Sequence, residues 1–208
     1  MTGLERRQIK GAACVLMTFL WLMPIAAWAD DSEVAIFSPG QAIELDGDEG
    51  LALFELVIDG TAPSMNVARL SHRKSTPPPH DEPVSRKRSS VVRLDQAPTE
   101  WVVLRLREGW YQITEVDAPF FELPYRLDTS DDPLWRFCVV PGKTAYAGRL
   151  FIAKERRTDF VEVTLESRIA FQFETLQAHR DDWFGDANLI YGRAIPDPYV
   201  DTLLENWR

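Results

Sequence analysis

A mainly β protein is the fold class that the sequence predicts, with a β-sandwich as the expected architecture and a small barrel as the alternative. From Glu33 onward, apolar and polar residues alternate with a period of two in short runs, which is typical of half-buried strands. Gly, Pro and Asp residues bound these runs, and about ten of them follow one another without a long helix between them. An α/β fold is therefore disfavoured.

Four segments in the first half of the chain predict strands: 34–37, 51–58, 65–70 and 90–94. Residues 51–58 are nearly all apolar, which favours a central strand that is covered on both faces. Glu55 is the one charged residue in this run. A buried carboxylate is costly without a partner, so we expect Glu55 to have a polar partner or a route to solvent.

Three β-hairpins are predicted in the second half of the chain. They comprise residues 101–116 with a turn at Glu108 and Gly109, residues 135–152 with a turn at Pro141 and Gly142, and residues 161–173 with a turn at Glu166 and Ser167. In each, alternating apolar residues flank a short turn. Pro followed by Gly suits a type II turn, because proline presets φ and glycine accepts the positive φ of the next position.

Helical signals are confined to the C-terminal part. Asp197 and Pro198 provide an N-cap and a first-turn proline. The apolar residues that then recur on one helical face are Tyr199, Leu203, Leu204 and Trp207. This short helix is expected to dock on the sandwich. A further helical turn is expected over residues 176–184, ended by Gly185.

Residues 1–29 predict a signal peptide. Three basic residues precede an uncharged apolar stretch at 11–27, and the small residues Ala27 and Ala29 suit cleavage before Asp30. An uncleaved anchor is the alternative, since about 17 apolar residues approach the length that spans a bilayer. The mature chain, 30–208, is expected to form a single periplasmic or secreted domain that does not insert into a membrane after cleavage.

The mature chain is acidic. Residues 1–29 carry three basic residues and one acidic residue, so their removal changes the formal charge from −9 to −11. Nucleic acids and anionic membranes are bound mainly by Lys and Arg, so this charge argues against a nucleic-acid partner. Cys138 is the one cysteine left after cleavage, which excludes an intrachain disulfide. It is expected to be a small core residue.

Residues 72–90 differ from their surroundings because four prolines and five basic residues lie close together there. We expect an exposed loop, which is either a solvated insertion or a site that recruits an acidic partner or a proline-reading groove. His72, His80 and Asp81 have the donor types that Zn²⁺ or Cu²⁺ prefers, but a loop preorganises ligands poorly. No metal or other cofactor is therefore expected.

The commonest local signatures of enzymes are missing. The sequence contains no Gly-x-Ser-x-Gly elbow, phosphate-binding glycine loop, His-Glu-x-x-His or Cys-x-x-Cys motif. Carboxylates gather at 46–50 and at 128–132, where a hydrated turn and a weak calcium site are the alternatives. Carboxylates brought together from distant strands, or His179 with a nucleophile, leave a hydrolase open.

Five tryptophans remain after cleavage, and core packing is expected for most of them. They are Trp101, Trp110, Trp135, Trp183 and Trp207. Trp110 is the one expected at the surface, because it lies beside the predicted turn at 108–109 and alternates with Gln112 and Thr114. An exposed indole can stack on a sugar ring, so Trp110 is the candidate ligand-binding residue of a carbohydrate-binding module.

Residues 106–113 (LREGWYQI) and 137–148 (FCVVPGKTAYAG) resemble uncharacterised bacterial envelope proteins. Those families have a Gly-x-Tyr hairpin followed by a Phe-x-Val, Pro-Gly, Tyr-x-Gly hairpin. The resemblance covers residues 100–175 and implies a small sandwich of immunoglobulin or transthyretin type, with glycines in its turns and aromatic residues in its core. It implies no catalytic residue. Many relatives are lipoproteins, whereas this chain lacks a lipobox.

We therefore expect an exported, non-catalytic protein that binds another envelope protein or supports the envelope. Loops and exposed strand edges would make its contacts. A carbohydrate-binding module is the alternative function, and a hydrolase is the third.

Overall fold

The computed structural model describes residues 34–71, 77–79, 89–120, 123–155, 160–184 and 188–205. The predicted signal peptide, with its processing site at Ala29 and Asp30, lies outside the described residues. So do His72, His80 and Asp81, together with most of the predicted loop 72–90.

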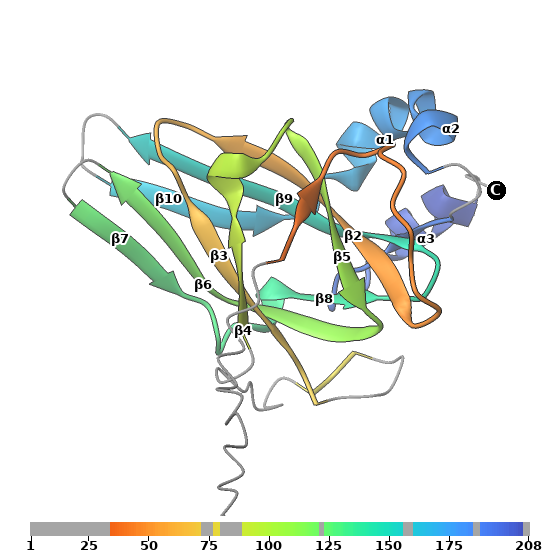
Figure 1. Ribbon diagram of the computed structural model, residues 1–208, viewed down its shortest axis with the longest axis horizontal. Coiled ribbons are helices and arrows are strands. Elements are labelled where there is room, and N and C mark those ends of the chain that lie inside the picture. The colour runs from red at the N-terminus through yellow and green to blue at the C-terminus, as the bar shows by residue number, and fades with distance from the viewer. Residues whose placement is uncertain are drawn as a thin grey trace, which may run out of the picture.

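The described chain forms two β-sheets that face each other (Figure 1). Sheet A contains, in spatial order, β1 (Ile36–Phe37), β5 (Trp101–Arg107), β2 (Glu49–Ile58), β9 (Thr144–Glu155) and β10 (Phe160–Glu166), and β11 (Leu189–Tyr191) also pairs with β9. Sheet B contains β4 (Ser89–Arg93), β3 (Ser64–Arg69), β6 (Gly109–Phe120) and β7 (Leu123–Asp128), and β8 (Arg136–Val139) also pairs with β6. The prediction of a mainly β chain is confirmed.

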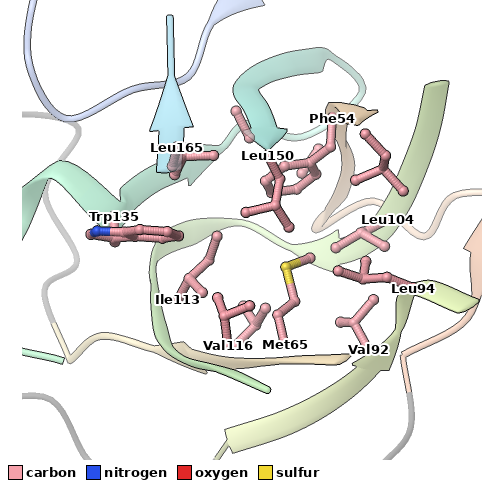
Figure 2. Close-up of a cluster of buried hydrophobic side chains, with 14 of the residues drawn as sticks. Phe54, Met65, Val92, Leu94, Leu104, Ile113, Val116, Trp135, Leu150 and Leu165 are labelled. Atoms are coloured by element: carbon pink, nitrogen blue, oxygen red, sulfur yellow. The ribbon is translucent and has the colours of Figure 1, made fainter. Parts of the chain in front are cut away.

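The larger core lies between the two sheets. It is built from alternate residues of their strands, because successive side chains of a strand point to opposite faces. Figure 2 shows Phe54, Leu104 and Leu150 of sheet A gathered with Met65 and Val92 of sheet B. All five side chains are buried.

A second core covers the outer face of sheet A. Leu53, Val103 and Tyr146 lie in one cluster with Ile169 and Leu176 of helix α1 (Ile169–Ala178). Helices α2 (Arg180–Trp183) and α3 (Pro198–Glu205) add further residues to this layer. Strand β2 is therefore covered on both faces, as its apolar run predicted.

The three predicted hairpins are wrong as strand pairs. Strands β5 and β6 belong to different sheets, and so do β8 and β9, so each of these turns carries the chain across the sandwich. The turn itself is as expected at Gly142, which has a φ of 64°. Strand β10 pairs with the preceding strand, β9, rather than with the segment that follows it. The turn residues show that the chain reverses its direction. The next strand can then form hydrogen bonds with the first strand in the same sheet, or it can pack against the first strand from the opposite sheet.

Residues 169–173 begin helix α1, so the strand predicted there is wrong. Ile169, Phe171 and Phe173 do alternate, but the residues that pack on sheet A are Ile169, Phe173 and Leu176, which have the i, i+4, i+7 spacing of a helix. Phe171 is 78% exposed. A short apolar run is compatible with the period of a strand and with the period of a helix. Here, packing against sheet A favours the helix.

Helix α3 begins as predicted. Oδ1 of Asp197 accepts hydrogen bonds from the backbone nitrogens of Tyr199 (3.1 Å) and Val200 (3.4 Å). The docked face agrees with the expected one in part: Leu204 packs against the second core as predicted, whereas Tyr199 is exposed and Val200 is buried instead. Trp207 lies outside the described residues.

Gly50 allows the turn before β9 to lie directly against β2. A Cβ on Gly50 would lie 2.2 Å from the carbonyl oxygen of Val140 and 3.1 Å from that of Lys143. Two hydrogen bonds fasten the same contact, from Gly142 N to the oxygen of Glu49 (2.8 Å) and from Leu51 N to the oxygen of Lys143 (3.0 Å). Strands β2 and β9 continue from here as parallel neighbours.

We expect Gly50→Ala to lower the free energy of unfolding by roughly 2 kcal/mol or more, because a backbone carbonyl must move to admit the methyl group. Gly47→Ala is the matched control, since nothing lies within 4 Å of its Cβ position. The control should change the free energy of unfolding by less than about 0.5 kcal/mol. Urea unfolding measures both, and equal effects would contradict the role given to Gly50.

Candidate functional site

Trp110 is buried at 3% exposure, so the prediction that its indole faces solvent is wrong. The residue does not follow a hairpin turn. It lies near the start of β6, which pairs with β3 on one side and with β8 on the other. Gln112 and Thr114, on the same face, are also buried. Protein therefore covers the outer face of sheet B at this point.

The other tryptophans of the described chain are buried or partly buried. Trp101 and Trp135 are buried, as expected of core residues. The indole of Trp183 stacks on His179, with ring centroids 4.5 Å apart and an angle of 7° between the planes. The tryptophans that the structure describes therefore include no wholly exposed indole, and Trp183 is partly buried.

A buried polar network lies on the outer face of sheet B, where Trp110 was expected to meet solvent. Nε2 of Gln112 donates to the carbonyl oxygens of Thr129 (2.7 Å) and Asp132 (2.9 Å). Its Oε1 accepts from Nε of Arg136 (2.8 Å). Arg136 is only 1% exposed, and its Nη1 donates to the carbonyl oxygen of Pro79 (2.6 Å). The network ties β6 to two segments that are distant in sequence.

A second buried arginine, Arg193, fixes the chain that follows β11. Its guanidinium donates to the carbonyl oxygens of Leu134 (2.8 Å), Ala147 (3.2 Å) and Leu165 (3.2 Å). Burial lowers the pKa of Arg193, but a guanidinium is basic enough to remain charged. Gly148 leaves room for it, because a Cβ there would lie 2.7 Å from Nη1 of Arg193.

The two arginines hold three segments around one apolar groove, which has a volume of about 460 Å³. The groove is lined by Pro77, Pro78, Pro133, Ala194, Ile195 and Pro196. Leu134 and Ile195 are 47% and 44% exposed, respectively. Apolar residues that remain open to solvent on a shaped surface are typical of a binding site.

The proline segment 77–79 is docked on the sandwich rather than fully solvated. Pro78 is buried between the exposed Pro77 and Pro79, and the carbonyl of Pro79 accepts the hydrogen bond from Arg136. Within the exposed loop predicted over 72–90, the described residues 77–79 are therefore docked on the sandwich, and Ser89 and Ser90 already belong to β4.

Sequence reasoning missed Arg136 and Arg193 as parts of a site. Arg136 lies between Trp135 and Phe137, and a charged residue at such a position of an alternating strand is typical of a solvent-facing side chain. The available signal was Gln112, which shares a strand face with Trp110 and Thr114. An indole and an amide side chain on one strand face are compatible with a face that protein covers as well as with a face that is exposed to solvent.

The two carboxylate clusters bind groups of the protein itself. Glu49 accepts hydrogen bonds from the backbone nitrogen of Asp46 (2.9 Å) and from Nε of Arg105 (2.5 Å), and the arginine bond lowers the pKa of Glu49. Asp128 accepts from the nitrogen and hydroxyl of Ser130, and Asp132 from the nitrogen of Leu134. In the described ranges, no group of three or more His, Cys, Asp or Glu residues is placed to hold a metal.

Cys138 is half-buried on β8 and forms no disulfide. Burial raises the pKa of its thiol to about 11. Since the thiolate is the reactive form, this cysteine is poorly suited to nucleophilic or redox chemistry at neutral pH.

Glu55 is a buried carboxylate on the outer face of sheet A, beneath helix α1. Its Oε1 accepts a hydrogen bond from Nε2 of Gln172 (3.0 Å), and Nε of Arg149 lies 3.7 Å away. Oε2 of Glu55 and Nε of Arg149 have no hydrogen-bond partner. Burial raises the pKa of Glu55, and Arg149 opposes this only in part. The polar partner that the sequence predicted for Glu55 is therefore present as Gln172. This partner satisfies Oε1 of Glu55 and leaves Oε2 without a hydrogen bond.

Neither a comparison with protein-family models nor a comparison with curated proteins found a match. Over the described part of the chain, every helix is too short or too polar to cross a membrane.

We expect Glu55→Gln to raise the free energy of unfolding near neutral pH and to have little effect in acid. A carboxyl group whose pKa is raised in the folded state contributes stability below its unfolded-state pKa and loses that contribution as the pH rises through the folded-state pKa. The amide removes the buried charge. Urea unfolding at about pH 4 and about pH 7 measures the difference.

The matched control for this measurement is Glu162→Gln, which changes an exposed carboxylate on β10. Its effect on stability should be small at both pH values. If Glu55→Gln destabilised the protein more at neutral pH than in acid, the sign assigned to Glu55 would be incorrect.

Arg136→Met should lower the free energy of unfolding by about 3 kcal/mol, because Gln112 and the carbonyl of Pro79 lose their buried donor. Arg126→Met is the comparison, since Arg126 is exposed and its Nε lies 3.5 Å from Oε1 of Glu115. An exposed pair of this kind contributes about 0–1 kcal/mol. Equal losses for the two variants in urea unfolding would show that the buried network does not hold the segments.

Proposed function

We propose that this chain is an exported, non-catalytic protein that binds a partner protein through the apolar groove. The observation that carries the proposal is the exposure of Leu134 and Ile195 beside a proline-lined groove, on segments that Arg136 and Arg193 hold in place. Exposed apolar residues on an ordered surface provide the anchors of protein interfaces.

The proposal places the protein in the periplasm or outside the cell, and the signal-peptide pattern of residues 1–29 supports that location. The partner is then another envelope protein, because that is what the mature chain meets after export. We also propose that the two sheets form a sandwich of immunoglobulin or transthyretin type. The facing sheets and the resemblance over residues 100–175 support this classification.

A photo-crosslinking amino acid at Ile195 should give a discrete covalent adduct with one partner in cells that export the protein. The control position is Phe171, which is also exposed but lies on α1, away from the proline segment at the bottom of Figure 1. Gel mobility and mass spectrometry report the adduct. Leu134→Asp should remove it, because the new carboxylate must be desolvated on binding. Adducts at both positions, or at Phe171 alone, would refute the proposal.

A further inference from the structure

We propose that Glu55 acts as a pH-sensitive switch beneath helix α1, which stays docked on sheet A while Glu55 is protonated and opens when Glu55 releases its proton to solvent. This inference goes beyond the proposed function, because it concerns the outer face of sheet A and does not involve the groove. It follows from the contacts of Glu55, from the charges around it and from the way in which α1 is held.

Glu55 lies under α1 with one oxygen of its carboxyl group unsatisfied. The side chain is buried, and Nε2 of Gln172 on α1 donates to Oε1 (3.0 Å). Oε2 has no hydrogen-bond partner among the described residues, and neither has Nε of Arg149, which lies 3.7 Å from Oε1. A carboxylate taken out of water needs close, well-aligned donors. The docked arrangement therefore suits a neutral carboxyl group better than an ionised one.

The charges around Glu55 also favour its protonated form. Two guanidinium groups and two carboxylates act on it, namely Arg149, Arg168, Glu100 and Glu166. These charges balance while Glu55 is neutral, whereas an ionised Glu55 makes three carboxylates against two guanidinium groups. Nε of Arg168 already donates to Oε2 of Glu166 (2.8 Å). Burial accordingly raises the pKa of Glu55, and Arg149 opposes this only in part.

Helix α1 brings no charge that offsets an ionised Glu55. Its one charged residue, Glu174, is exposed, and the group that reaches Glu55 is the neutral amide of Gln172. Burial also raises the pKa of Tyr146, near Glu55 on β9, so its phenol stays neutral. Loss of the proton from Glu55 therefore leaves an incompletely compensated negative charge between sheet A and α1.

Helix α1 depends on its docking because it is short and poorly capped. It contains ten residues, and isolated helices shorter than about 12–15 residues are marginal in water. Arg168 occupies the N-cap position, and no side-chain cap is formed there in the described structure. A cation is also unfavourable at this end of the helix dipole. The helix is instead held by Ile169, Phe173 and Leu176, which pack on sheet A.

Local opening of α1 should therefore increase from acid to neutral pH. A carboxyl group whose pKa is raised in the docked state stabilises docking below the pKa of the open state. This contribution is lost as the pH rises through the pKa of the docked state. Opening uncovers apolar residues on the outer face of sheet A, including Leu53 and Val103.

The test is hydrogen exchange of the purified exported protein, followed by mass spectrometry at about pH 4 and about pH 7. Rates are corrected for the intrinsic exchange rate at each pH. Protection of the α1 amides should fall by at least about tenfold from the lower to the higher pH. At the higher pH, α1 should also exchange at least about tenfold faster than β6, because local opening leaves sheet B closed.

Two variants assign the effect to Glu55. Glu55→Gln keeps the shape of the side chain and an acceptor for Gln172 but removes the charge, so α1 protection should agree within about twofold at the two pH values. Glu162→Gln, which changes an exposed carboxylate on β10, should keep the wild-type difference. Far-ultraviolet circular dichroism verifies that both variants are folded.

The inference is overturned by equal protection of wild-type α1 at the two pH values, by a pH difference that persists in folded Glu55→Gln, or by equal protection of α1 and β6 at neutral pH. The last result would mean that the whole domain opens instead of the helix. The wild-type comparison needs no variant, so it decides the question even if Glu55→Gln does not fold.

Discussion

The parallel pairing of β2 with β9 is the contact on which the other parts of this fold depend. These two strands are central neighbours in sheet A and carry residues of both cores, since Phe54 and Leu150 face sheet B while Leu53 and Tyr146 face the helices. The hydroxyl of Tyr146 accepts from the backbone nitrogen of Arg168 at the start of α1 (3.1 Å). One strand pair therefore positions the helical layer on one side and the opposite sheet on the other.

The same pair connects the core to the groove through an irregularity. The register between β2 and β9 shifts after Leu53, and Gly148 adopts a φ of 131° at that point. A bulge of this kind re-aims the backbone locally. The carbonyl of Ala147 and the space above Gly148 accept the guanidinium of Arg193, which also holds Leu134 beside the groove. The shape of the groove is therefore linked to the register of a central strand.

Local patterns predicted most strands, but they did not predict which strands pair. Alternation at 101–107 or 161–165 depends on neighbouring residues and is visible in the sequence, whereas the crossing from β5 to β6 depends on where the rest of the chain packs. Strand β7, with prolines at 119 and 124 near its turn, and the three-residue β11 gave little local signal. The groove combines residues 77, 133 and 195, whose proximity is a property of the folded chain alone.

The two buried arginines are compatible with the proposed binding role as well as with a stabilising one. A protein that required only stability would gain from apolar residues in place of buried charges, since their desolvation costs several kcal/mol per ion. Arg136 and Arg193 instead hold loop carbonyls, at Pro79 and Leu134, in fixed positions. Fixing a surface before it meets its ligand lowers the entropy lost on binding. The cost of two buried guanidinium groups is explained if the segments that they hold must keep one shape for recognition.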